Sequence, residues 1–167
     1  MKTVDSYRFL DGISKRLIKS WVGLEAPREI PWTPLSKPVA ECTVALISSG
    51  GIALKSDTPF DQEGERRNPW WGDPSYRIIP RGTKSEDIRV YHMHIDPRSA
   101  EQDINCLLPL ERLDDLVRAG KVGKSASSHY SYMGYLLDPK ELLAKSIPSI
   151  IEHLRQESVD VAVFIPA

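Results

Sequence analysis

Apolar residues recur at helical spacing near the start of the chain. Over residues 10–21 they fall on one helix face, at Leu10, Ile13, Leu17, Ile18 and Trp21. Steps of three and four residues are typical of an amphipathic helix, so we expect one here. The next segment, 25–38, contains four prolines, which argues against a helix or a central strand and predicts an extended surface crossing.

Two runs of apolar and alternating residues predict strands. Residues 42–48 (CTVALIS) are apolar and β-branched and lead into a Ser-Gly-Gly turn, which is typical of the first strand of a sheet. Residues 89–94 (RVYHMH) alternate and predict a second strand, which Asp96 and Pro97 end. Between them, residues 57–81 are rich in Pro, Gly, Asp and Arg but include two adjacent tryptophans. Because tryptophans need packing partners, we expect a long ordered loop there.

The second half of the chain predicts two helices and a closing strand. Residues 109–119 have Pro at the first turn and apolar positions at helical spacing. Residues 137–156 predict the last helix, which Asp138 caps and Pro148 should bend or split. Residues 160–167 (DVAVFIPA) are apolar after the first position, which predicts a parallel strand covered on both faces.

The order of these elements indicates a single α/β domain over residues 1–167, a layered fold with a mainly parallel sheet flanked by helices. In open α/β sheets, ligands and reacting groups gather beyond the carboxyl ends of the strands, and Ala167 stands at such an end. We therefore expect a sheet that is missing its later strands and that offers an unpaired edge for a homodimer. A complete domain with a C-terminal central strand is the alternative.

Charge and composition argue against several classes of protein. The chain has 22 Lys and Arg against 23 Asp and Glu, so it lacks the broad positive field that favours nucleic-acid binding. Its apolar runs are shorter than the about 18 to 20 residues that span a bilayer, and residues 1–11 lack the apolar stretch of a secretory signal. We expect a cytoplasmic protein with no membrane partner. The cysteines, Cys42 and Cys106, form no CxxC pair, and we expect both to be buried apolar residues rather than metal ligands.

The turn after the first strand is a candidate binding site. Ser48, Ser49, Gly50 and Gly51 stand at the carboxyl end of that strand, where glycines would let a ligand approach free backbone N–H groups. Such a turn could hold a carboxylate or a phosphate. Neither a Walker loop nor a GxGxxG motif is present, which argues against the common nucleotide sites. A bare turn without a ligand is the alternative.

Two histidines are the candidate catalytic residues. His92 and His94 are two residues apart in the expected second strand, so their side chains should share a face near its carboxyl end. There they could orient a substrate or move a proton. Metal binding is an alternative in which His129, Asp96 or Asp103 would supply a third ligand. The remaining alternative is a pair of imidazoles hydrogen-bonded within the core.

Three further polar residues are weaker candidates for substrate binding: Asn105, Ser131 and Tyr132. Asn105 and Asp103 precede the helix that begins with Pro109, and loop hydrogen bonding or capping is their alternative role. A Ser-His-Asp triad could be assembled from Ser131, one of the histidines (His92) and Asp103. The GxSxG motif of such hydrolases is absent, which argues against that triad.

Several segments together resemble the selenoprotein B family of the glycine, sarcosine, betaine and D-proline reductases. The matching pieces follow one another in order over residues 40–167: TVALISSGGI at 43–52, GDPSYRIIPR at 72–81, HMHID at 92–96, DINCLLPLERLDDLVRAGKVGK at 103–124, HYSYMGY at 129–135 and the closing VDVAVFIPA. Each piece alone is modest, and the ordered combination is specific. The short stretch ahead of TVALISSGGI is closer to the D-proline reductase type than to the longer glycine reductase type.

The resemblance implies a dithiol-driven reductive cleavage of a carbon–nitrogen bond in a small amino acid: glycine, sarcosine, betaine or D-proline. In such enzymes a selenocysteine, or a cysteine in some relatives, attacks a carbon that is activated as an imine on the pyruvoyl group of a partner subunit. Thiols of a dithiol donor protein then reduce the selenium-containing product. A selenolate suits this step because it is ionised at neutral pH and strongly nucleophilic, as a low-pKa thiolate is. In this frame the turn at 48–51 would supply backbone donors, and His92 and His94 would act on the substrate or on protons.

The sequence departs from the family at the nucleophile. No selenocysteine is present, and neither Cys42 nor Cys106 stands where the family's nucleophile would, shortly after a strand like VDVAVFIPA. We therefore expect the nucleophile after Ala167, an in-frame UGA codon read as stop, and a chain that is inactive alone. Reading the gene past codon 167 tests this hypothesis, because a UAA or UAG codon there would contradict it.

Two other classes of function remain open on the sequence alone. The first is a complete α/β module that binds a small carboxylate or a partner protein without catalysis. The second is a metal-dependent hydrolase built on His92 and His94, which predicts stoichiometric metal in the purified protein.

Overall fold

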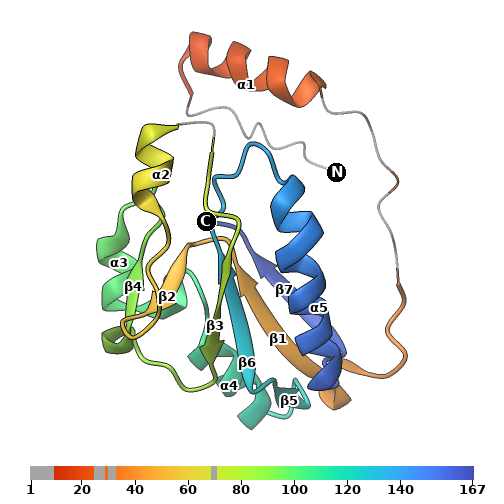
Figure 1. Cartoon of the computed structure of the whole chain (residues 1–167). Helices are drawn as coiled ribbons and strands as arrows, with labels where there is room; N and C mark the ends of the chain where they lie inside the picture. Colours follow the sequence, from red (N-terminus) through yellow and green to blue (C-terminus); the bar gives the residue numbers. More distant parts are fainter. Residues whose placement is uncertain (1–9, 25–28, 30–32, 69–70) are drawn as a thin grey trace. The chain divides into compact units, whose positions relative to one another are not determined.

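The computed structural model describes residues 10–24, 29, 33–68 and 71–167, and the chain separates into two compact units, residues 1–34 and residues 35–167. In the first unit, helix α1 (Gly12–Leu24) confirms the predicted amphipathic helix (Figure 1). Asp11 caps α1 by accepting the backbone N–H groups of Ile13 and Ser14 at 2.9 and 3.0 Å. Most of the extended crossing expected at 25–38 lies outside the described residues.

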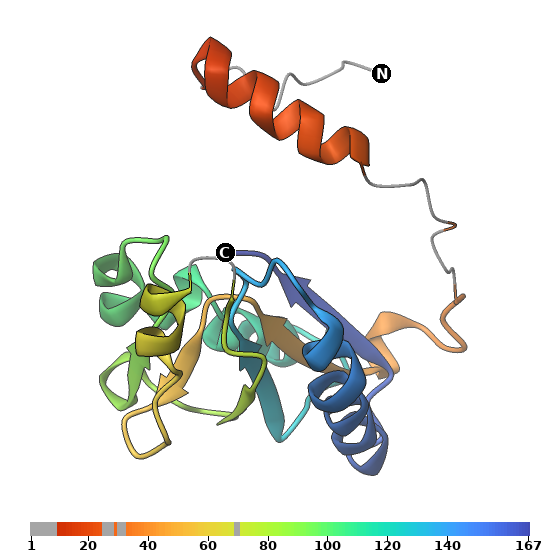
Figure 2. The ribbon, with the colours of Figure 1, turned by 45° about the horizontal axis from the view of Figure 1, so that its top comes forward.

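The second unit is built on a five-stranded, mostly parallel sheet (Figure 1, Figure 2). Strand β1 (Thr43–Ser48) is central, with β7 (Val161–Ile165) parallel to it on one side. On the other side β5 (Lys124–Ser125) and β6 (Ser128–Tyr132) pair with β1, also in parallel. Strand β3 (Tyr76–Pro80) is antiparallel to β6. This arrangement confirms the predicted α/β class and the mainly parallel sheet.

Helices and a short ribbon surround the sheet. The ribbon pairs β2 (Ile52–Leu54) antiparallel with β4 (Ile88–Val90). The α-helices of this unit are α2 (Gln62–Arg67), α3 (Pro97–Gln102), α4 (Leu110–Arg118) and α5 (Ile147–Gln156). Short 3-10 turns lie at Val39–Glu41, Ser85–Asp87 and Ile104–Cys106. None of the helices in the described ranges is long and apolar enough to cross a membrane.

The last predicted helix is divided, as its proline led us to expect. A π-helical turn at Leu142–Ser146 leads into α5, and Pro148 lies in the first turn of α5. Proline has no N–H to donate to the preceding turn, and a π turn is one way to accommodate that loss. Asp138 accepts the N–H of Lys140 at 3.2 Å, close to the predicted cap.

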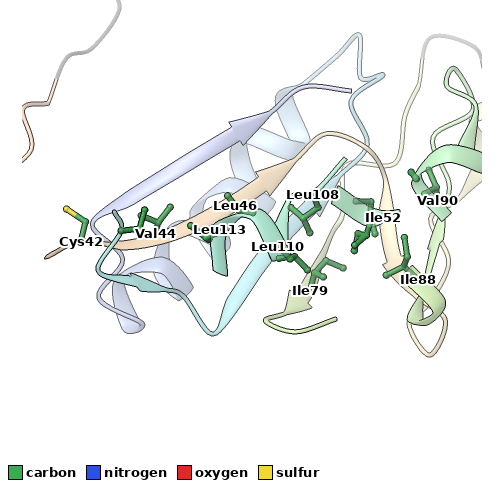
Figure 3. Close-up of a cluster of buried hydrophobic side chains, with 13 residues drawn as sticks. Cys42, Val44, Leu46, Ile52, Ile79, Ile88, Val90, Leu108, Leu110 and Leu113 are labelled. Atoms are coloured by element: carbon green, nitrogen blue, oxygen red, sulfur yellow. The ribbon is translucent and has the colours of Figure 1, made fainter. Parts of the chain in front are cut away.

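Strand β1 carries the core because side chains cover both of its faces. Leu46 belongs with Leu113 of α4 to one cluster of buried side chains, which Figure 3 shows. Ile47 belongs with Tyr130 and Ile150 of α5 to a second cluster. Consecutive residues of a strand point to opposite faces, so α4 and α5 cover opposite faces of the sheet.

The prediction of a second strand at 89–94 is wrong in its extent and in its place. The strand ends at Val90, and it pairs in the ribbon rather than in the main sheet. The chain turns directly afterwards, and within this turn the N–H of His94 donates back to Nδ1 of His92 at 3.2 Å. The alternating pattern at 89–94 thus extends beyond the strand into residues that form a turn, which is why it predicted too long a strand.

The segment 57–81, expected as a long ordered loop, contains two regular elements, α2 and β3. Asp61 caps α2 by accepting the N–H of Gly64 at 2.8 Å. Strand β3 lies at the edge of the sheet, where the proline at its end, Pro80, removes no internal hydrogen bond. Of the tryptophan pair, Trp70 lies outside the described residues.

Strand β7 confirms the predicted closing strand but not the predicted cover on both faces. It aligns with β1 from Val161 to Ile165. Val163 and Phe164, which point to opposite faces, are 42% and 64% exposed. Within the described part of the chain β7 pairs with β1 alone, so its other edge is open, and its faces are covered only in part, for example where Ala162 packs with Ile150 of α5.

Candidate functional site

The carboxyl ends of β1, β6 and β7 meet at the turn formed by Ser48, Ser49, Gly50 and Gly51 (Figure 1). Gly51 has a φ of 60°, in the left-handed region that glycine adopts most easily. The chain leaves β1 sharply here and enters β2. The candidate turn is therefore at the expected end of the sheet.

The backbone N–H groups of this turn are used within the protein. Three donate at 3.1, 3.0 and 2.9 Å: Ser49 to the Ile165 carbonyl, Gly50 to Ser48 Oγ and Gly51 to the Tyr132 carbonyl. The first and third of these hydrogen bonds tie the turn to β7 and β6. A ligand here would have to be recognised by side chains or displace one of these bonds, so the binding role of 48–51 stays a prediction.

The two glycines of the turn are required by neighbouring segments. A Cβ added at Gly51 would lie 2.5 Å from Met133 Sδ and 3.1 Å from the backbone nitrogen of His92. A Cβ added at Gly50 would lie 2.9 Å from Leu107 Cδ1. Segments that follow β6, β4 and α3 thus close on the turn. This packing accounts for the glycines without a ligand.

Ser131 and Tyr132, both predicted to bind substrate, lie on β6 beside the turn. Ser131 is buried, and its Oγ accepts the N–H of Ile52 at 2.8 Å, which ties β6 to β2. Tyr132 is half-buried, and burial raises the pKa of its hydroxyl, so it stays protonated at neutral pH. The structure places both near the turn, and their contacts with a substrate stay predictions.

His92 and His94 lie together in the turn after β4 rather than on a strand. Their rings meet edge to face with centroids 5.8 Å apart. His92 is buried, and this burial, together with the neighbouring His94, lowers its pKa. The backbone of His92 packs against Gly51, which brings this turn next to the end of β1. Their catalytic role stays a prediction.

Glu65 on α2 joins this group, and the sequence analysis missed it. Its Oε1 atom lies 3.1 Å from Nε2 of His94, and its side chain is 1% exposed, whereas that of His94 is 49% exposed. The other oxygen, Oε2, is buried and has no hydrogen-bond partner among the described residues. Burial raises the pKa of Glu65, an effect that His94 opposes. No signal within QEGERR separates Glu65 from its charged neighbours, because only tertiary packing buries it.

Tyr135 covers one face of the His94 ring. The two ring centroids lie 4.0 Å apart with the planes inclined at 39°. Tyr135 follows β6, so it comes from the same segment as the predicted Ser131 and Tyr132. We call Glu65, His92, His94 and Tyr135 the histidine cluster.

Asn105, the remaining predicted substrate-binding residue, caps α4. Its Oδ1 accepts the N–H of Glu111 at 3.0 Å, and its Nδ2 donates to Asp103 Oδ1 at 2.8 Å. Capping is the alternative that the sequence left open for Asn105. A contact with substrate stays a prediction, although Leu107 of the same segment does reach Gly50.

The metal and triad alternatives find no matching geometry in the part of the chain that the structure describes. There, no group of three His, Cys, Asp or Glu side chains is placed to hold a metal ion. Ser131 and Asp103 are bonded to Ile52 and to Asn105, and no hydrogen bond between described residues joins either to His92.

His129, considered as a third metal ligand, is a core imidazole. Its Nδ1 accepts the N–H of Leu46 at 3.0 Å, and its Nε2 lies 3.2 Å from Ser125 Oγ. Both ring nitrogens are therefore engaged inside the fold. Burial lowers the pKa of His129 to about 4, so it is neutral at pH 7.

The two cysteines differ in exposure, which corrects the expectation that both are buried. Cys42 is buried directly before β1, at the end of the strand opposite the candidate turn. Cys106 is exposed, because it ends the short 3-10 turn at Ile104–Cys106, whose buried residue is Ile104. Neither forms a disulfide.

Comparison with known proteins gives one family and three relatives. The model of the glycine/sarcosine/betaine reductase selenoprotein B family matches residues 13–166. The chain is 31% identical over 129 residues to D-proline reductase subunit gamma of Acetoanaerobium sticklandii, covering 77% of this chain and 50% of that protein. It is 29% identical over 105 residues to glycine reductase complex component B subunit gamma of Carboxydothermus hydrogenoformans, with coverages of 63% and 23%.

The third relative is betaine reductase complex component B subunit beta of Peptoclostridium acidaminophilum, 28% identical over 153 residues, which covers 86% of this chain and 34% of the relative. The chain thus spans about half the length of the D-proline reductase subunit and smaller shares of the other two. No solved structure matches the chain significantly.

Proposed function

The chain belongs to the glycine/sarcosine/betaine reductase selenoprotein B family, and we propose that it is the amino-terminal part of a reductase subunit that cleaves a carbon–nitrogen bond in a small amino acid. The family match confirms the resemblance drawn from the sequence. The three relatives are named as subunits or components of reductases, and two of them explicitly as components of complexes. These names support the proposal that this chain functions together with partner subunits. The proposed substrate is glycine, sarcosine, betaine or D-proline, and the proposed reductant is a dithiol donor protein.

The observation that carries this proposal is that three separate motif segments converge on one place. The segments at 43–52, 92–96 and 129–135 are far apart in sequence. In the structure Gly51 packs against His92 and Met133, and Tyr135 stacks on His94. Convergence at the carboxyl ends of parallel strands is typical of sites in α/β enzymes. The half-exposed His94 ring supports a role in holding substrate or moving a proton.

A pyruvoyl group on a partner subunit is the cofactor that we propose for this reaction. Its carbonyl would activate the amino acid by withdrawing electrons from the bond that breaks. The residue of this chain that we propose beside such a group is His94, because its imidazole is 49% exposed and lies in the histidine cluster next to the turn at 48–51; the protonated Tyr132 hydroxyl is a second candidate. They would orient the amino acid and hold protons there.

We propose that residues other than 1–167 supply the nucleophile, because the two cysteines are poorly placed for it. Cys42 is buried at the end of β1 opposite the turn at 48–51. Cys106 is exposed but precedes α4, whereas the resemblance puts the nucleophile after a strand like β7. Residues of this chain would then form one side of the site, and a selenocysteine or cysteine from another segment would complete it.

We also propose that β7 is an association surface, with a second copy of this chain as its occupant. Residues 161–165 carry no charge, so antiparallel pairing of two β7 edges would bring no like charges together within the strand. Beside β7 lies a groove of about 260 Å³, lined by apolar side chains that include Val44, Leu116 and Val163. Val163 on one face and Phe164 on the other flank this open edge, so a second β7 paired there would reduce the exposure of both.

Reconstitution tests the proposed reductase function. The chain, extended by the expected nucleophile segment, is assembled with a pyruvoyl-containing partner subunit, and dithiol-dependent loss of each of the four amino acids is followed by NMR. The proposal predicts loss of at least one of them, with one dithiol oxidised for each carbon–nitrogen bond cleaved. Turnover that is equally fast without this chain, or no turnover by a correctly assembled complex, would contradict it.

A further inference from the structure

Glu65 is a buried carboxylate for which the function proposed above has no use. Its side chain is 1% exposed, its Oε1 lies 3.1 Å from His94 Nε2, and its Oε2 has no partner among the described residues. A buried carboxylate with an oxygen left unpaired is unfavourable when it is charged, because the interior does not replace its lost hydration. The fold therefore favours the form of this pair in which Glu65 holds the proton.

The charged and titratable groups around the pair come from three segments. On α2, Arg66 is exposed and contacts Glu63 at 3.4 Å. From the turn after β4, His92 meets the His94 ring edge to face. From the segment after β6, Tyr135 stacks on the His94 ring. Among the described residues, the only polar contact of the Glu65 carboxyl is His94 Nε2.

His94 is placed to connect this buried carboxyl with the outside of the fold. One ring nitrogen, Nε2, faces Glu65, and the other, Nδ1, makes no hydrogen bond among the described residues. The backbone N–H of His94 donates to Nδ1 of His92, which holds the backbone in the turn. Tyr135 packs against one face of the His94 ring and limits its rotation. The His94 side chain is 49% exposed, so part of the ring is accessible from outside the fold.

We propose that Glu65 and His94 form a proton relay that delivers a proton to the departing nitrogen of the substrate, an inference that rests on the reductase function proposed above. In the resting pair the Glu65 carboxyl donates its proton through Oε1 to Nε2 of a neutral His94, whose Nδ1 carries the ring proton. As the carbon–nitrogen bond breaks, the electron pair on nitrogen takes the proton from Nδ1, and the Glu65 proton moves to Nε2. His94 is neutral before and after, and Glu65 becomes a carboxylate that water reprotonates through His94.

The alternative role for this pair is purely structural. In that case an ionised Glu65 would hold a protonated His94 and so tie α2 to the turn after β4. The two roles differ in where the proton resides at neutral pH. Burial, the larger effect, raises the pKa of Glu65 and supports the relay, whereas the smaller opposing effect of His94 favours the ion pair.

Carbon-13 NMR of the chain labelled at glutamate carboxyls measures where the proton resides. The Glu65 signal is assigned through its bonds to its own backbone amide, so the wild-type titration needs no variant. If the relay is correct, Glu65 keeps its proton at neutral pH, far above the about 4.3 at which an ordinary glutamate loses it. In His94→Phe, which keeps a ring on Tyr135 but removes the hydrogen bond to Glu65, we expect Glu65 still to hold its proton at neutral pH, because the carboxyl stays buried. A Glu65 that is ionised at neutral pH in the wild type and becomes protonated in His94→Phe would identify the structural ion pair and overturn the relay.

The assembled reductase gives the second readout. We expect Glu65→Gln to lower kcat about 100-fold with little change in KM, and to flatten the pH dependence of kcat. The matched control is Glu63→Gln, which changes an exposed residue of the same helix and should leave kcat unaltered. An active wild-type complex in which Glu65→Gln is equally active would overturn the relay and leave the reductase function standing. A complex with no reductase activity would contradict the proposed function, while the NMR titration would still decide how the pair holds its proton.

Discussion

The Nδ1 atom of His129 on β6 accepts the backbone N–H of Leu46 on β1 at 3.0 Å. The imidazole is buried, and its Nε2 lies 3.2 Å from Ser125 Oγ. A ring nitrogen can accept only while it carries no proton, so this link between two central strands requires neutral His129. Burial accordingly lowers the pKa of His129 to about 4.

The first prediction is that His129 makes stability depend on pH. An unfolded histidine takes up a proton below about pH 6.5, whereas folded His129 does so only below about pH 4, so the unfolded state binds more protons between these values. The free energy of unfolding should therefore fall as pH decreases through this window, by about 2 kcal/mol between pH 7.5 and pH 5 from this residue. Urea unfolding at several pH values measures it.

The control for this prediction is His129→Asn, which offers an oxygen to the Leu46 N–H without titrating. Its overall stability will differ from that of the wild type, but the slope with pH is the quantity of interest. We expect a shallower slope in His129→Asn over the same window. An identical slope in the two proteins would show that His129 does not titrate as described.

The second prediction concerns the turn at the end of β1. Gly51→Ala places a Cβ 2.5 Å from Met133 Sδ at a residue with a φ of 60°, so both a steric contact and backbone strain oppose it. We expect a loss of about 3 kcal/mol in the free energy of unfolding. Gly82→Ala is the matched control, because Gly82 also has a positive φ, 84°, but nothing lies within 4 Å of an added Cβ. Equal losses in the two variants would show that neighbouring segments do not close on the turn.

The third prediction concerns the open edge of β7. Phe164 is 64% exposed, and Phe164→Lys puts a charge on the proposed surface between two copies. We expect the wild-type chain to show a mass that rises with concentration in light scattering, and Phe164→Lys to remain a monomer. Leu143→Lys changes an exposed apolar residue elsewhere and should behave like the wild type. A wild-type chain that stays monomeric at all concentrations would rule out the homodimer.

Strands β1 and β7 and helix α4 could be predicted because each has a continuous or periodic apolar run. Strand β3 could not, since YRIIP lies among prolines and charged residues and depends on its antiparallel partner β6. The exposure of β7 could not be predicted from the sequence either. An apolar run indicates that a strand can be buried, but it does not show which neighbouring elements cover it.

The candidate site could be predicted in part for a similar reason. Residues that follow strands gather at one end of a parallel sheet, so the turn at 48–51 and the histidines at 92 and 94 could be expected together. Glu65 could not, because it lies in a polar helix and only the tertiary fold buries it. The use of the turn's own N–H groups likewise depends on the Ile165 and Tyr132 carbonyls, which the register of β7 and β6 brings close.

The measurement that tests the central claim most directly is kcat of the assembled reductase carrying His94→Gln, with His153→Gln on α5 as the control outside the histidine cluster. If the histidine cluster beside the ends of β1 and β6 is the working site, His94→Gln should lower kcat about 100-fold or more while the complex keeps its wild-type mass, and His153→Gln should retain wild-type kcat. A wild-type kcat in His94→Gln would contradict the account.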